Sequence, residues 1–191
     1  MIGQTSSVYY TNVGPPGLTA MTDAERWIRD LQLQRHPEGG WFREVYRATE
    51  TIPRRSLPAR FAADRSHSTA IYFLLEGSDF SALHRLKQDE LWHFYDGGRV
   101  TLEMIDSDGD VSTAILGLNV DTGERPMAVV EAGSLFGATA EVDSYGLVGC
   151  TVAPGFDFND FDMPSREQLL DQFPQHSSLI RRLTRERLDG R

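Results

Sequence analysis

Residues 84–93 concentrate more titratable chemistry than any other part of this 191-residue chain. They include two histidines, His84 and His93, and two acids, Asp89 and Glu90, in a region that otherwise reads as an apolar strand. Burying such side chains costs free energy unless each is paired, changes its protonation state or binds a metal. The segment therefore predicts either an acid–base site or a metal site.

The alternation of a β-strand decides which of these side chains can meet. If residues 90–95 form an undistorted strand, Glu90, Trp92 and Phe94 share one face, and His93 lies on the other. On the strand before it, His84 falls on one face together with the aromatic Phe80. We therefore predict that His84 and Glu90 meet inside an aromatic pocket, while His93 points away and plays a structural role.

A metal site needs more ligands than this pair supplies. A catalytic zinc, iron or manganese ion generally takes at least three imidazole or carboxylate ligands. His93 would be the third only if the strand were distorted, and His36 or His67 only if a loop folded over the pocket. We therefore predict no cofactor, with a divalent metal held by His84, Glu90 and His93 as the alternative.

Without a metal, the same side chains suit general acid–base catalysis. An aromatic pocket raises the pKa of a carboxylic acid, and a histidine exchanges protons near neutral pH. His84 or Glu90 would then remove a proton beside a carbonyl group, with Tyr72 or Tyr95 as the acid. The predicted catalytic residues are His84, Glu90 and Tyr72.

Short apolar segments separated by turn residues follow one another from residue 41 onward, which is typical of strands rather than helices. Turn signals such as Asp96-Gly97-Gly98 separate them. About nine strands at this spacing predict an all-β sandwich or barrel. The expected strands are 41–48, 69–75, 80–85, 90–95, 100–105, 111–116, 128–130, 134–140 and 146–152.

Helices are expected on either side of these strands. Thr22 is followed three residues later by Glu25, the pattern of a capping box, and begins a short helix. Ser165 is suited to cap the first of two helical segments near the other end. Residues 1–20 show no periodicity and predict a mobile arm, and residues 21–191 are long enough for one domain with one core.

Two further segments are expected to support the site. Residues 53–68 have few apolar positions and predict a long loop, a kind of segment that is often functional. Beyond Pro154, the acids Asp157, Asp160 and Asp162 alternate with phenylalanines. We expect the phenylalanines to hold the last strand against the core, while the acids face water or a dimer partner.

Charge and hydropathy exclude several classes of partner. The chain has 28 acidic and 19 basic residues and a formal charge of −9, which opposes binding to nucleic acid or to anionic membranes. It has no apolar run near the ~20 residues that span a bilayer, and no signal peptide, so a cytoplasmic location is expected. The lone Cys150 is predicted to be a small core residue.

The segment 77–97 resembles the first motif of the cupin superfamily, in which a His-x-His pair, a later Glu and a closing Gly line a small β-barrel. His84, Glu90 and Gly97 match this motif, but Leu86 occupies the position of the second histidine. The second cupin motif, Pro-x-Gly-x-x-His, resembles residues 131–136. Phe136 replaces its histidine, so two of the four usual metal ligands are missing.

The chain is more specifically similar to cupin family 5. The resemblance covers about residues 24–184 and implies a double-stranded β-helix jelly roll with short N- and C-terminal helices. It also implies a homodimer and a small-molecule pocket inside the barrel, but no established reaction. The matching landmarks are His36-Pro37-Glu38-Gly39-Gly40-Trp41-Phe42-Arg43-Glu44, residues 70–75, His84, residues 89–95 and residues 148–158.

Residues 38–44 also resemble the entry strand of the cupin epimerases that act on nucleotide-linked deoxysugars. In those enzymes a Gly turn precedes aromatic and Arg side chains that face the pocket. Arg43 would then hold a phosphate or carboxylate in a bidentate grip, or would simply pair with Glu44 or Glu38. The predicted substrate-binding residues are Arg43, Phe42, Trp92, Phe94, Phe136 and Glu38.

Three functions are compatible with these observations. The first is a metal-independent isomerase or epimerase that acts on a sugar-like or carboxylated metabolite. The second is a metal-dependent cupin oxygenase or lyase. The third is a protein that binds a metabolite without converting it, since a fold by itself does not specify a function.

Overall fold

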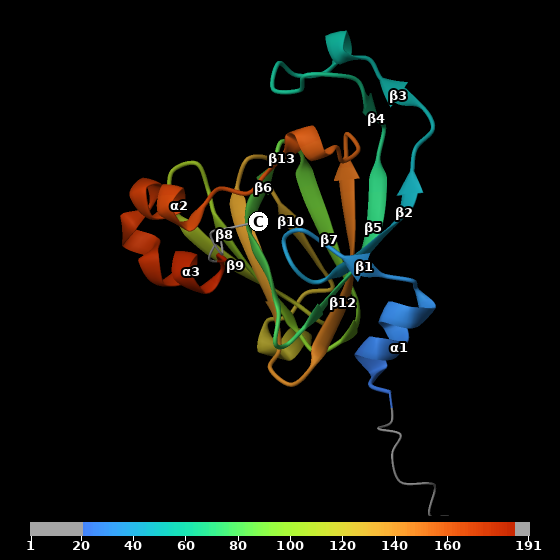
Figure 1. Ribbon diagram of the computed structural model, residues 1–191, viewed down its shortest axis with the longest axis vertical. Helices are drawn as coiled ribbons and strands as arrows, with labels where there is room; N and C mark the ends of the chain where they lie inside the picture. Colours follow the sequence, from blue (N-terminus) through green and yellow to red (C-terminus); the bar gives the residue numbers. More distant parts are fainter. Residues whose placement is uncertain (1–20, 186–191) are drawn as a thin grey trace, which may run out of the picture.

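A computed structural model describes residues 21–185, and its main body consists of two facing β-sheets (Figure 1). The larger sheet has six strands in the order β1-β2-β5-β12-β7-β10, and the smaller has five in the order β13-β6-β11-β8-β9. The sheets remain separate in their hydrogen bonding, which is the jelly-roll arrangement. The predicted mobile arm, residues 1–20, lies outside the described residues.

The elements follow one another closely along the chain. The larger sheet is built from β1 (Gln34–Arg35), β2 (Trp41–Arg47), β5 (Thr69–Glu76), β7 (Asp89–Gly97), β10 (Met127–Val130) and β12 (Tyr145–Ala153). The smaller is built from β6 (Phe80–Leu86), β8 (Val100–Ile105), β9 (Val111–Leu116), β11 (Leu135–Ala140) and β13 (Phe161–Asp162). The remaining elements are α1 (Asp23–Asp30), β3 (Thr51–Ile52), η1 (Arg54–Ser56), β4 (Arg65–Ser66), η2 (Val120–Thr122), η3 (Phe158–Asp160), α2 (Arg166–Gln172), η4 (Pro174–His176) and α3 (Ser177–Arg182).

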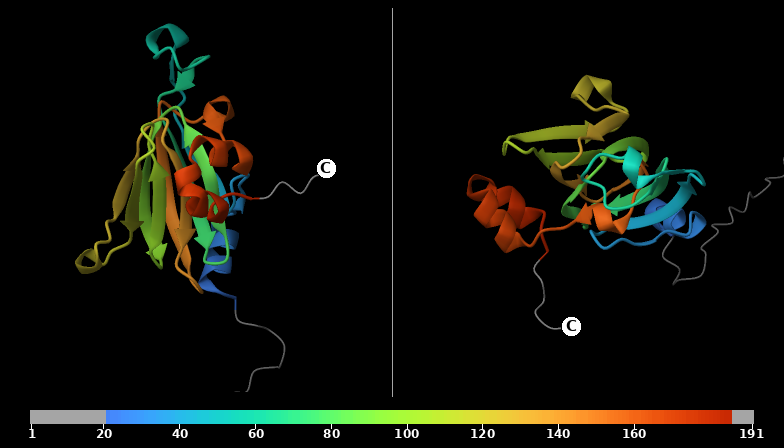
Figure 2. Two further views of the ribbon diagram at one scale, coloured as in Figure 1. Left: turned by 90° about the vertical axis from the view of Figure 1, so that its left-hand side faces the viewer. Right: turned by 90° about the horizontal axis from the view of Figure 1, so that it is seen from above.

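Three apolar clusters hold these layers together. The largest lies between the sheets and includes Phe73, Trp92 and Phe136, each 1% exposed. A second joins α2 and α3 to the outer face of the smaller sheet, and a third packs α1 against the larger sheet (Figure 2). β6 in the smaller sheet and β7 in the larger sheet each have one face toward the space between the sheets, where a pocket can form.

The predicted strands and helix caps are confirmed. All nine expected strands are present, with bounds that differ by at most two residues from the expected ones. Thr22 and Ser165 each form a capping box with the residue three positions later. Cys150 is buried, as expected for a core residue. In the part of the chain that the structure describes, no helix combines the length and apolar character needed to span a membrane.

The hairpin between β1 and β2 folds its loop, residues 36–40, toward the smaller sheet. Gly39 and Gly40 have φ angles of 112° and 71°, in the region that only glycine adopts without strain. A Cβ atom at Gly40 would lie 2.8 Å from the carbonyl oxygen of Leu74. The backbone oxygen of Glu38 accepts a hydrogen bond from the amide of Ala82 on β6. The two glycines therefore place this loop beside β6.

For Asp160 alone, the structure corrects the expectation that the acids after Pro154 face water or a partner, since Asp162 is exposed. Asp160 is 2% exposed and forms a bidentate ion pair with Arg65, whose Nε and Nη2 lie 2.6 and 2.7 Å from its carboxylate oxygens. Gln88 donates a further bond of 2.7 Å to Asp160. Residues 53–68 carry η1 and β4, and buried Arg65 ties this segment to the one that follows β12.

Candidate functional site

A cavity of about 310 Å³ lies between the two sheets at the end where residues 154–162 cross. Six aromatic side chains form part of its wall: Phe42, Phe73, Trp92, Phe156, Phe158 and Phe161. The buried histidine and carboxyl side chains of the wall are His36, Glu38, His84 and Glu90. A small ligand with both apolar and polar parts suits such a lining.

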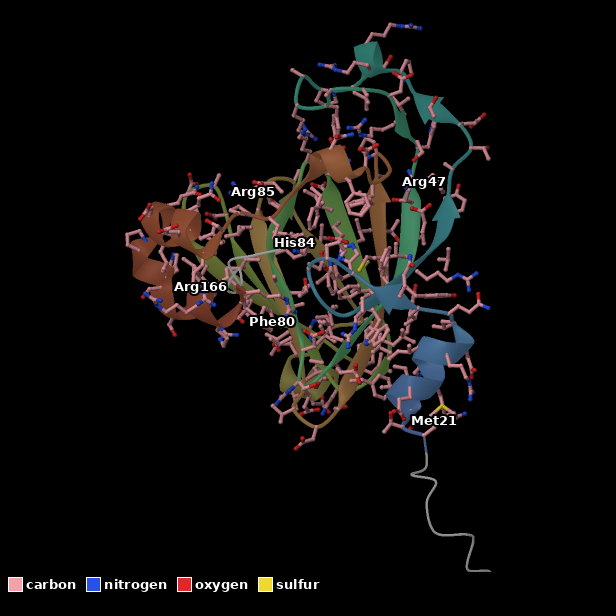
Figure 3. The ribbon with its side chains drawn as sticks, viewed as in Figure 1. Met21, Arg47, Phe80, His84, Arg85 and Arg166 are labelled. Carbon is pink, nitrogen blue, oxygen red and sulfur yellow. The ribbon has the colours of Figure 1, made fainter. Side chains whose placement is uncertain are left out.

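Three elements supply the titratable side chains. His84 comes from β6, and Figure 3 shows it in the interior of the molecule. Glu90 comes from β7, and the strand alternation that sends it inward sends Trp92 inward too. The β1–β2 loop brings His36 and Glu38 from the third side. Residues far apart in the sequence therefore meet around one cavity.

The carboxylate of Glu38 is the centre of the polar cluster. Its Oε2 lies 3.2 Å from Nδ1 of His36 and 3.3 Å from Nε2 of His84, and its Oε1 accepts a 2.9 Å bond from Ser81. Burial raises the pKa of Glu38, but the charge of His84, the hydrogen bond and charge of His36 and the bond from Ser81 outweigh burial. The net pKa is below the ordinary value, and Glu38 is ionised at neutral pH.

His84 is held at both ring nitrogens. Its Nδ1 lies 2.8 Å from the carbonyl oxygen of Ala82, and because a carbonyl only accepts, Nδ1 must carry a hydrogen. Its Nε2 faces Glu38, and a hydrogen there completes an ion pair. The ring also packs on Phe136, with 4.1 Å between ring centroids. Both ring nitrogens of His84 therefore face protein acceptors, so neither is free to remove a proton from a ligand.

His36 has the opposite arrangement. Its Nδ1 lies 3.2 Å from the Glu38 carboxylate and 3.5 Å from the backbone nitrogen of Glu38. We assign a hydrogen to Nδ1 on the shorter contact with the carboxylate, so Nε2 is the ring nitrogen that faces away from Glu38. Nε2 forms no hydrogen bond with any described residue, and the ring lines the cavity. His36 and Glu38 thus form a histidine–carboxylate pair with one free nitrogen.

Glu90 is in a very different electrostatic environment from Glu38. Burial and, after it, the nearby Glu38 carboxylate raise the pKa of Glu90 to about 8, although Trp92 and Cys150 lower it slightly. Glu90 is therefore protonated at neutral pH, while Glu38 is ionised. Two carboxyl groups whose surroundings separate their pKa values are typical of an acid and a base that work together.

The structure brings several predicted site residues to the cavity. His84, Glu90, Glu38, Phe42 and Trp92 all line it. Phe136 does not form part of its lining but lies behind His84, so its expected direct contact with substrate is corrected to support of the His84 ring.

Other predicted site residues lie away from the cavity. Arg43 and Tyr72 are register partners on β2 and β5, and they point to the outer face because their neighbours Phe42 and Phe73 point inward. Arg43 instead donates to the backbone oxygen of Leu31 and the side chain of Gln32. The predicted roles of Arg43 in substrate binding and of Tyr72 as the acid are therefore wrong, because both side chains lie outside the cavity.

Three further predicted residues, Tyr95, Phe94 and His93, also lie outside the cavity lining. Tyr95 is half exposed and packs edge-on against Tyr72, outside the cavity. Phe94 packs against the core between the sheets and does not line the cavity, which corrects its assignment to substrate binding. His93 faces away, 3.5 Å from the hydroxyl of Thr151, as alternation predicts.

Two functional features were missed by the sequence analysis. His36 was considered only as a metal ligand, although the His-x-Glu spacing at residues 36–38 followed by two glycines was the available signal. The guanidinium group at the cavity belongs to Arg47 rather than Arg43. Arg47 forms a bidentate pair with Glu44, with bonds of 2.9 and 2.6 Å.

The donors at this site do not fit the metal centre that cupin barrels imply. Leu86 and Phe136, which occupy two ligand positions, have no donor atoms, and both nitrogens of His84 already face other groups. Among residues 21–185 no three His, Cys, Asp or Glu side chains are grouped as a metal site would require. Neither His84, Glu90 and His93 nor any other described trio forms such a group.

The sequence model of the family Cupin_5, described as Cupin superfamily (DUF985), matches residues 25–164. This chain belongs to the Cupin_5 family. The matched range includes every residue named above as lining the cavity. The part of the chain that matches the family therefore contains the whole cavity lining. The jelly roll expected from the resemblance is confirmed.

Known proteins match this Cupin_5 chain across most of their length. Protein SO0799 from Shewanella oneidensis is 40% identical, with a TM-score of 0.78 over 86% of this chain and 99% of that one. A hypothetical protein from Leishmania major is 33% identical, with a TM-score of 0.77 over 85% and 99%. The uncharacterized protein YML079W of Saccharomyces cerevisiae is 30% identical over 71% of this chain and 72% of its own.

Proposed function

We propose that this Cupin_5 protein binds a small sugar-like or carboxylated metabolite and isomerises it by acid–base chemistry without a metal. The observation that carries the proposal is the pairing of two carboxyl groups of opposite protonation in one aromatic cavity. Glu38 is ionised and holds His36, whereas Glu90 is protonated. The cavity volume of about 310 Å³ suits a metabolite of a few carbon atoms.

The roles follow from which atoms are free. Nε2 of His36 removes a proton from a ligand carbon beside a carbonyl, and Glu38 stabilises the imidazolium that forms. Glu90 gives its proton to the carbonyl oxygen, which produces an enol. The imidazolium then returns its proton to the neighbouring carbon, while Glu90 takes one from the adjacent hydroxyl. Both groups end in their starting states, so no oxidant or reductant is required.

Deuterium exchange on a panel of small metabolites tests this proposal. Sugars, hydroxy acids and keto acids are incubated with the protein in D₂O, and loss of carbon-bound proton signals is followed by NMR. We expect exchange at one carbon of a bound metabolite, and we expect His36→Gln and Glu38→Gln to slow it by about 10²–10⁴-fold. A chelator should leave the exchange rate unchanged.

His67→Gln is the matched control, because His67 is exposed and lies outside the cavity. Its exchange rate should equal that of the wild type. A metabolite that raises the melting temperature but is never exchanged would favour a protein that only binds its ligand. Exchange that a chelator abolishes would contradict the metal-independent chemistry.

A further inference from the structure

Two buried polar atoms in the cavity wall have no hydrogen-bond partner among the described residues. They are Oε2 of Glu90, on a residue 7% exposed, and Nε1 of Trp92, on a residue 1% exposed. The indole lies near enough to Glu90 to favour its ionised form, yet no hydrogen bond of acceptable geometry joins the two. Buried polar groups in native proteins are nearly always bonded, so this pair needs an explanation.

No neighbouring side chain among the described residues gives either atom a hydrogen bond of acceptable geometry. Glu90 and Trp92 are alternate residues of β7, so both side chains leave the same face of the strand. Their register partners are Val152 and Cys150 on β12, and Val130 and Ala128 on β10. Glu90, Trp92, Cys150 and Val152 also line the cavity. The cavity is thus the side of the pair on which a ligand would lie.

The chemistry of the two groups specifies that partner. An indole N–H only donates, and a neutral carboxylic acid adds an O–H donor beside it. We propose that Glu90 and Trp92 together bind one carbonyl oxygen of the ligand, so the metabolite is a ketone or an aldehyde. This inference rests on the proposed function, in which Glu90 gives its proton to the carbonyl oxygen. It adds Trp92 as a second hydrogen-bond donor to that oxygen. Two donors on one oxygen stabilise the negative charge that develops there when His36 removes the proton.

A pair of ligands of the same shape tests the inference by binding alone. Cyclohexanone and methylenecyclohexane differ only in a C=O group against a C=CH₂ group, and neither donates a hydrogen bond. In an apolar cavity without donors the alkene binds more tightly, because the ketone loses its hydrogen bonds to water. At a pH well below the pKa of Glu90, we expect the wild type to bind the ketone at least as tightly as the alkene. We also expect the bound carbonyl to show a lower infrared stretching frequency than in hexane.

Matched tryptophan variants then assign the effect to Trp92. Trp92→Phe should lower the ratio of ketone to alkene affinity about tenfold, the effect of one lost hydrogen bond. It should also move the carbonyl frequency toward the hexane value. Trp41→Phe is the control, because the indole of Trp41 donates to Glu76 rather than facing the cavity. Its affinity ratio and carbonyl frequency should match the wild type.

Because both ligands are measured on the wild-type protein, this test does not depend on whether a variant folds. A hexane-like carbonyl frequency in the wild type, tighter binding of the alkene, or binding of neither compound would overturn the two-donor site. None of these results depends on turnover. Deuterium exchange that requires His36 would still support the proposed function if the donor pair failed, and a ketone preference without any exchange would support the donor pair alone.

Discussion

Glutamine in place of Glu90 is expected to stabilise the protein by about 4 kcal/mol at about pH 8 and to change its stability little at about pH 5. The pKa of Glu90 rises from an ordinary value of 4.5 to about 8 in the folded protein. Above the ordinary value the unfolded chain releases this proton while the folded protein keeps it. Stability therefore falls as pH rises between the two values, and glutamine removes this loss.

Urea denaturation of the wild type and of Glu90→Gln at both pH values measures the effect. The difference between the two proteins at each pH cancels the titration of all other groups. Glu131→Gln is the control, because Glu131 is exposed and does not line the cavity. Equal stabilities of wild type and Glu90→Gln at both pH values would show that Glu90 ionises normally.

Loss of the buried charge at Asp160 is expected to destabilise the protein by about 3–5 kcal/mol. Asp160→Asn leaves the guanidinium of Arg65, a residue 3% exposed, without its bidentate partner. Burial tends to raise the pKa of Asp160, but the bonds from Arg65 and Gln88 outweigh it and keep this carboxylate ionised. Urea denaturation at neutral pH measures the loss.

The neighbouring ion pair supplies the control for this prediction. Asp162 lies 3.1 Å from Arg85, but its side chain is 63% exposed. Asp162→Asn should therefore cost less than about 1 kcal/mol. A double variant, Arg65→Met with Asp160→Leu, should recover most of the stability lost in Asp160→Asn, because no unpaired charge stays buried. Equal small losses in both asparagine variants would mean that the buried pair does not anchor residues 154–162.

Local patterns in the sequence were enough to predict the elements of the fold. The helix caps predicted at Thr22 and Ser165 depend on side chains three residues apart, and both formed, each as a capping box. Strand alternation placed Glu90 and Trp92 inward and His93 outward, because the period of a strand is local as well. The same rule argues against Arg43, since Phe42 faces the cavity and its neighbour on β2 must face outward.

The chemistry of the site depends on contacts that no local pattern contains. Glu38 reaches His84 only because the β1–β2 loop folds beside β6. Burial and, after it, the charge of Glu38 raise the pKa of Glu90. Asp160 is buried only because Arg65 arrives from a distant loop. Sequence reasoning therefore found His84 and Glu90, but not the histidine that is free to act as the base.

Titration of the Glu90 carboxyl group tests the central claim most directly. Infrared difference spectra of wild type and Glu90→Gln across the pH range isolate the band of this one protonated carboxylic acid. We expect the band to persist through neutral pH and to disappear with a midpoint of about 8. A band lost near the ordinary value of 4.5 would show that Glu90 is ionised beside Glu38, and the assignment of acid and base would be contradicted.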